Sequence, residues 1–113
     1  MEEKDKLKKT EQITKLKVSG KGDTVKLAAA IAGSIETAGK TCLSCIGAAA
    51  VNNACKAVAT AAHMISADRN TQKKTRLCMV PCFVKRKIGG DYLTTIELTV
   101  TEIDSDANTA AQD

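Results

Sequence analysis

The chain has 113 residues, which is enough for one domain and too few for two. Hydrophobic residues make up 43% of it, but with one Phe, one Tyr and no Trp the core must be built from Val, Ile, Leu, Ala and Cys. The net charge of +4 is mild, and no stretch approaches the roughly 18 uninterrupted apolar residues of a membrane span, so the sequence excludes a transmembrane helix.

The first half of the chain predicts a strand followed by a helix. The polar–apolar alternation of Lys15–Ser19 is typical of a strand. Asp23 or Thr24 can cap a helix over Val25–Ala38, and Gly39 stands where a helix usually ends. The predicted buried face of this helix consists of Leu27, Ala28, Ile31, Ala32 and Ile35.

Small residues mark both predicted helices. Gly33, inside the first helix, costs about 1 kcal/mol in helix propensity against alanine, which predicts close backbone packing at that point. Thr41–Ile46 predicts a second strand, and Gly47 turns the chain into a second helix over Ala48–Ala67. The predicted apolar stripe of this second helix consists of Val51, Ala54, Cys55, Val58, Ala61, Ala62 and Ile65.

The second half of the chain ends in a long hairpin. Residues 68–74 form a predicted polar loop, and Thr75–Ile88 predicts a third strand, interrupted by Pro81, which indicates an edge position or a bulge. A turn over residues 89–91 leads into a fourth strand over Tyr92–Glu102.

The order strand, helix, strand, helix, strand, strand predicts an α+β fold of two layers. A four-stranded mixed sheet with both helices on one face satisfies this order. The other face of the sheet then needs cover from the amino-terminal arm or from another subunit. The modest core that small side chains supply at this length also favours a homodimer or higher oligomer.

The charges are unevenly distributed along the chain. Seven basic and no acidic residues lie from Arg69 to Lys87, whereas five acidic and no basic residues lie from Glu97 to Asp113. This pattern indicates an anionic partner or an internal charge balance, and a solvated surface is the alternative. Residues 1–14 mix both signs and predict a flexible arm, with a short helical extension as the alternative. Residues 104–113 predict a disordered acidic tail, which leaves 15–103 as the domain.

The sequence contains no catalytic constellation, so it predicts a protein without catalysis, metal or cofactor. Cys42 and Cys45 form a CxxC pair, but residues three apart on a strand point to opposite faces and cannot hold one ion. His63 is the only histidine and lies outside the apolar stripe of its helix. The odd number of five cysteines and an amino terminus without an apolar signal segment predict a reducing compartment inside the cell, cytoplasm or nucleus, with the cysteines acting as small hydrophobes.

A basic tripeptide precedes the hairpin turn. Lys85, Arg86 and Lys87 give the third strand a cationic end, and a cationic ribbon can follow a phosphate backbone. Because strand residues alternate, Lys85 and Lys87 share one face and Arg86 takes the other. The alternative is a charged edge that discourages aggregation between sheets.

Two further places can attract an anion. Lys21 stands between two glycines that let the backbone approach an anion closely, although a solvent-exposed turn lysine is the alternative. Asn52 and Lys56 are four residues apart near the start of the second helix, where free amides favour anions. A polar helix surface is the alternative for this pair.

Three segments resemble, in order, the stage V sporulation protein S (SpoVS) family: LKVSGKGDTVKLAAAIAGSI, CIGAAAVNNACKAVATAAHMI and LCMVPCFVKRKIGGDYLTTIELTV. The resemblance covers about Leu16–Glu102. The family is similar to the Alba proteins, which have the same order of strands and helices and bind DNA or RNA as dimers. The resemblance implies an Alba-like fold with nucleic-acid contacts in the first turn, the second-helix region and the hairpin. On this chain those places are Ser19, Lys21, Asn52, Asn53, Lys56, Lys85, Arg86 and Lys87.

Two functions of different classes follow from these observations. The first is a DNA- or RNA-binding protein, regulatory or architectural, that contacts the phosphate backbone largely without reading sequence. The scarcity of aromatic residues argues against base stacking as its main source of affinity. The second is a structural or adaptor subunit that docks on a larger protein assembly through its hairpin and charged termini. The mild net charge favours this second function. Neither function predicts a membrane partner.

Overall fold

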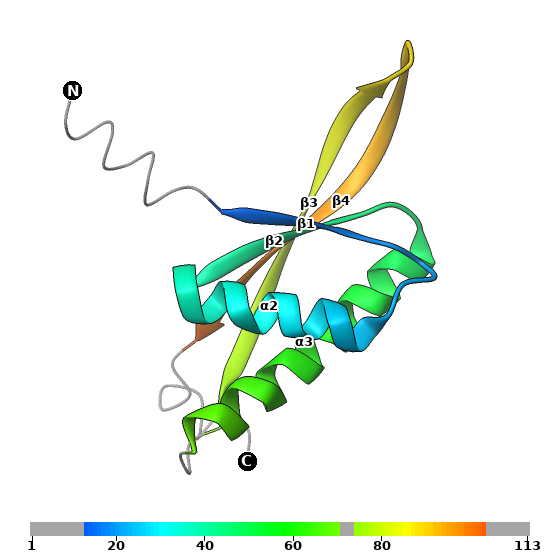
Figure 1. Cartoon of the computed structure of the whole chain (residues 1–113). Coiled ribbons are helices and arrows are strands. Elements are labelled where there is room, and N and C mark those ends of the chain that lie inside the picture. Colours follow the sequence, from blue (N-terminus) through cyan, green and yellow to red (C-terminus); the bar gives the residue numbers. More distant parts are fainter. Residues whose placement is uncertain (1–12, 71–73, 104–113) are drawn as a thin grey trace, which may run out of the picture.

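The computed structural model describes residues 13–70 and 74–103, and it confirms the predicted order of strands and helices (Figure 1). The sheet order is β1-β2-β4-β3, with β1 parallel to β2 and with β4 antiparallel to both of its neighbours. The sheet is therefore mixed, as predicted. The elements are β1 (Thr14–Val18), α2 (Thr24–Ala38), β2 (Lys40–Cys45), α3 (Ala48–Arg69), β3 (Arg76–Ile88) and β4 (Asp91–Ile103).

The hydrophobic core lies between the sheet and the two helices, which cover the same face of the sheet (Figure 1). Leu43 of β2 lies directly opposite Leu98 of β4, and both side chains are buried. They pack in one cluster with Ile31 of α2 and Ile65 of α3. This arrangement confirms the two-layer prediction and leaves the other face of the sheet without helices among the described residues.

Helix α2 begins and ends where the sequence predicts. The Asp23 carboxylate accepts hydrogen bonds from the amides of Val25 and Lys26, and Gly39 ends the helix with a left-handed φ of 82°. The prediction for Gly33 is wrong, because no atom outside its immediate neighbourhood would lie within 4 Å of a β-carbon placed there. Gly33 follows the buried Ile31 by two positions, which is about 200° around the helix, so it faces outward.

Helix α3 is longer than predicted, and the residues that it buries differ in part from the predicted apolar stripe. It continues through Asp68 to Arg69, two residues that the sequence assigned to a loop. The predicted burial of Cys55 is wrong, because this residue is exposed. Alanines occupy several sides of this helix, so the apolar pattern alone does not fix which side is buried. The buried residues are Ala50, Ala54, Ala57, Val58, Ala61 and Ile65.

Strands β3 and β4 form one continuous hairpin. Their register runs unbroken from the pair Arg76 and Ile103 to the pair Ile88 and Asp91. The sequence is right that Pro81 marks an edge strand, since β3 lies at the end of the sheet. The prediction that the proline interrupts the strand is wrong, because β3 continues through it. On an edge strand, a backbone nitrogen that faces away from the sheet makes no hydrogen bond to a neighbouring strand, so a proline there removes none.

The cysteines do not all behave as buried hydrophobes. Cys42 and Cys45 are buried, and Cys45 joins the core beneath the helices while Cys42 contacts Glu97 on the open face. This confirms that the CxxC pair points to opposite faces. Cys55 and Cys82 are exposed, which corrects the prediction for these two residues. Cys82 is exposed because it lies on the edge strand and points to the face without helices.

The predicted arm and tail lie outside the described residues, except for Ile13 and Thr14, of which Thr14 belongs to β1. Among the residues that the structure describes, no helix is long and apolar enough to cross a membrane.

Candidate nucleic-acid interface

Three chain connections lie toward the same end of the sheet. Strands β1, β2 and β3 all run in the same direction, because β1 is parallel to β2 and both β2 and β3 are antiparallel to β4. The connections that follow them, residues 19–23, 46–47 and 89–90, therefore share an end (Figure 1). This topology places the three regions in which the predicted site residues occur toward the same end of the sheet.

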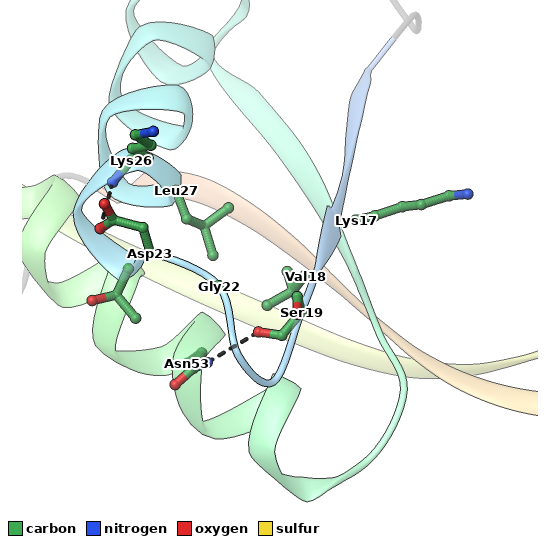
Figure 2. A pocket seen from close by; sticks show the side chains of 9 residues that line it. Lys17, Val18, Ser19, Gly22, Asp23, Lys26, Leu27 and Asn53 are labelled. Carbon is green, nitrogen blue, oxygen red and sulfur yellow. Dashed lines mark hydrogen bonds between the residues drawn. The ribbon is translucent and has the colours of Figure 1, made fainter.

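The turn after β1 is fixed to helix α3 by hydrogen bonds to Ser19. The Asn53 side-chain amide donates to the Ser19 carbonyl oxygen at 3.0 Å (Figure 2). The Ser19 hydroxyl accepts from the backbone amide of Lys21 at 3.1 Å. Ser19 and Asn53 thus have a structural role that the sequence did not predict: they hold the turn so that the exposed Lys21 lies beside the start of α3.

Gly20 permits this close approach. A β-carbon at Gly20 would lie 2.9 Å from the Ala49 β-carbon, a separation at which one of the two segments must shift. The glycines around Lys21 were predicted to open the backbone to an anion. For Gly20 the structure shows close contact with α3.

The two helix N-termini at this end differ in their caps. The Asp23 carboxylate caps α2, with an oxygen 2.9 Å from the Val25 amide, and its negative charge offsets the positive end of that helix. Helix α3 begins after Gly47, which has φ 89° and ψ 161° and provides no side-chain hydrogen bond. The first amides of α3 therefore stay available to an anion.

Asn52 and Lys56 are both exposed on α3, as predicted. Asn52, together with Thr94 and Phe83 of the hairpin, lines a hollow of about 660 Å³ that we call the α3–hairpin hollow. Because residues of both elements line this hollow, the start of α3 and the base of the hairpin are neighbours. Thr94 lies directly opposite Lys85. Lys56 lies one helical turn beyond Asn52.

The end of the hairpin extends past the rest of the sheet (Figure 1). The last β4 residue paired with β2 is Ile96, so Val84–Ile88 and Asp91–Thr95 pair only with each other. The register places alternate residues on two faces. We call one the lysine face, formed by Phe83, Lys85, Lys87, Tyr92, Thr94 and Ile96. We call the other the arginine face, formed by Cys82, Val84, Arg86, Leu93, Thr95 and Glu97.

Lys85 and Lys87 share the lysine face, as the alternation predicts. Both side chains are exposed, and neither makes an ion pair or hydrogen bond with the rest of the described chain. The lysine face carries no carboxylate. These two amines are therefore open to an external anion.

Arg86 has a different environment on the arginine face. Its Nη2 donates to a Glu97 oxygen at 2.8 Å, and the Lys15 amine of β1 lies 3.0 Å from the same oxygen. The hydrogen bonds from Lys15 and Arg86 hold the pKa of the Glu97 carboxyl below its usual value. The Glu97 carboxylate thereby joins three strands. The structure places Arg86 on the opposite face of the hairpin from Lys85 and Lys87, the two lysines of the same predicted contact region.

Sequence reasoning missed the location of the two aromatic residues. Phe83 is 78% exposed and Tyr92 is 71% exposed, and both lie on the lysine face. The signal was present in the sequence, since a two-residue turn at Gly89 and Gly90 pairs Lys87 with Tyr92. Counting back from that turn places both rings with the lysines.

The fold and this end of the sheet define a small α+β protein with a projecting basic hairpin. A family model described as Stage V sporulation protein S (SpoVS) matches residues 14–103. The chain belongs to this family, as the resemblance of its three segments predicted. A search of curated proteins found no match.

Proposed function

We propose that this protein binds DNA or RNA without catalysing a reaction, and that the lysine face contacts the phosphate backbone. The observation that carries the proposal is that Lys85 and Lys87 are exposed, unpaired within the described residues and free of any carboxylate on their face. Lysine amines in such a position can displace the counterions of a polyphosphate chain, which supplies sequence-independent affinity.

The other residues of the proposed interface supplement this contact. Lys21 lies at the same end of the sheet as the hairpin turn and beside the uncapped start of α3. Lys56, which is exposed on α3, adds a further positive charge in this proposal. Arg86 braces the hairpin through Glu97, so in this proposal its main role is structural. The resemblance to Alba proteins, which bind nucleic acids, supports the same function.

The test compares binding to DNA and RNA duplexes of equal length as the salt concentration rises. The double variant Lys85→Ala/Lys87→Ala should bind both polymers about tenfold more weakly or worse, and its slope of log affinity against log salt should be shallower by about two. The matched control is Lys40→Ala/Lys74→Ala, which removes the same charge at the opposite end of the sheet and should change little.

An adaptor role is the second candidate, and the α3–hairpin hollow favours it. Val51, Cys55 and Ile96 give this hollow apolar walls of the kind that protein partners cover. Absence of binding to either polymer at low salt would contradict the nucleic-acid proposal and support the adaptor. A homodimer also stays a prediction, with the open sheet face, where Val80 and Cys82 are exposed, as the surface for a second copy.

A further inference from the structure

The two aromatic side chains of this chain are both exposed, and both lie on the lysine face. The chain has one Phe, one Tyr and no Trp. A folded domain so poor in aromatic residues would gain most from them in its core, where rings contribute large buried areas. Here Phe83 and Tyr92 keep 78% and 71% of their surface exposed. Such exposure of large apolar groups marks an interaction surface.

The rings and the amines alternate along this face. Tyr92 lies directly opposite Lys87, and Phe83 lies four positions before Lys87 on β3. The two rings are therefore separated by about 13 Å along the hairpin. Lys85 lies between them, opposite Thr94. A ligand lying along the hairpin meets a ring, an amine and a second ring in turn.

This order of groups fits a strand of nucleic acid with unpaired bases. Aromatic rings offer stacking platforms to bases of any sequence, and neighbouring cations bind the phosphates that join those bases. A duplex cannot use the rings in this way because its base faces are already covered by stacked neighbours. Asn52 and Thr94, beside Phe83 in the α3–hairpin hollow, add an amide and a hydroxyl that can bond to base edges.

A protein partner fits this face less well. The buried centres of protein interfaces are depleted of lysine, because burying an amine without a carboxylate is costly. On the lysine face two amines lie among the exposed rings, and no carboxylate accompanies them. A second copy of this chain would bring more amines to the same place.

We propose that the lysine face binds single-stranded nucleic acid by stacking unpaired bases on Phe83 and Tyr92. This inference rests on the proposed nucleic-acid function and names the form of the polymer. It departs from the expectation drawn from the scarcity of aromatic residues, because both of the aromatic rings present are exposed on this face.

The chain provides its own probe for this inference. Tyr92 is the only tyrosine and there is no tryptophan, so tyrosine emission reports on Tyr92 alone. Single-stranded RNA and the RNA duplex of equal length are titrated at the same salt concentration, with correction for absorption by the nucleic acid. We expect stacking to quench the emission strongly with the single strand and weakly with the duplex.

Variants test the same inference by affinity. Tyr92→Leu and Phe83→Leu should each weaken single-strand binding by about tenfold and leave duplex binding unchanged. Tyr92→Phe, which keeps the ring, should retain single-strand binding. The matched control is Ile88→Ala, which removes an exposed apolar side chain from the opposite side of the same hairpin and should change neither affinity.

The outcomes separate this inference from the function on which it rests. Equal losses on single strand and duplex in the leucine variants, or no quenching by the single strand, would overturn stacking while backbone binding stands. A lower mass of Phe83→Leu in sedimentation, with an unchanged ratio of the two affinities, would assign the face to a second copy and also overturn stacking. Absence of binding to both polymers would overturn the proposed function and this inference together.

Discussion

The two faces of the hairpin carry cations from the same tripeptide, yet they leave those cations in different states. On the arginine face, Arg86 and Lys15 share the Glu97 carboxylate, whose side chain is only 11% exposed. On the lysine face, Lys85 and Lys87 have no partner within the described residues. Whether a cation braces the fold or stays free for a ligand therefore depends on a carboxylate that tertiary pairing places on the same face, more than on the local run of charge.

The largest effect on stability is expected from Glu97→Ala. Removing this carboxylate leaves Lys15 and Arg86 close together without a shared counter-charge. Both cationic side chains are more than a third exposed, so water screens part of the cost and the loss stays below that of a fully buried pair. We expect the free energy of unfolding to fall by about 2 kcal/mol in urea denaturation. An unchanged midpoint would show that Glu97 does not brace the hairpin.

Acid should weaken the same contacts without any mutation. Lys15 and then Arg86 lower the pKa of Glu97, and Arg69 lowers the pKa of Glu102. The folded protein therefore binds fewer protons than the unfolded chain does, so stability is fully present above the ordinary carboxyl pKa of 4.5 and is lost as the pH falls below it. Urea midpoints measured across this range should decline more gently in Glu97→Gln. If the urea midpoints of the two proteins declined equally with falling pH, Glu97 would not be a source of the acid sensitivity.

Arg86→Ala changes the tripeptide only on the arginine face. Lys15 still pairs with Glu97 in this variant, so the expected loss is about 1 kcal/mol, smaller than that of Glu97→Ala. Its salt slope for nucleic-acid binding should match that of the unchanged protein. A slope shallower by about one would instead mean that Arg86 contacts a phosphate directly.

The smallest effect on stability is expected from Lys85→Ala/Lys87→Ala. Neither amine has a partner in the described part of the chain, so each substitution should stay within about 0.5 kcal/mol in the same denaturation experiment. The nucleic-acid affinity of this variant should nevertheless fall. A large stability loss would mean that the lysine face is part of the folded core, which would break the contrast between the faces.

Much of the fold is predictable because local signals determine it. Asp23 and Gly39 bound α2 by capping chemistry, and Gly89 with Gly90 sets the hairpin turn. The sequence was less informative where the pattern is ambiguous. The alanine-rich α3 has apolar residues on several sides, so the burial of Cys55 was predicted wrongly.

The candidate site depends more on long-range pairing. The Arg86 contact with Glu97 requires the β3–β4 register, and the Lys15 contact also requires the place of β1 in the sheet. The hydrogen bond from Asn53 to Ser19 joins residues that are 34 positions apart in sequence. Such contacts follow from tertiary packing and have no local sequence signal. The place of Phe83 and Tyr92 on the lysine face, in contrast, follows from the turn and the alternation.

The most direct test of the interface is protection of lysine amines from acetylation, measured by mass spectrometry with and without bound single-stranded RNA. We predict that RNA protects Lys85 and Lys87 strongly and Lys21 in part, while Lys40 and Lys74 at the other end of the sheet react equally in both samples. Full reactivity of Lys85 and Lys87 in the bound sample, or protection centred on Lys40 and Lys74, would contradict the account.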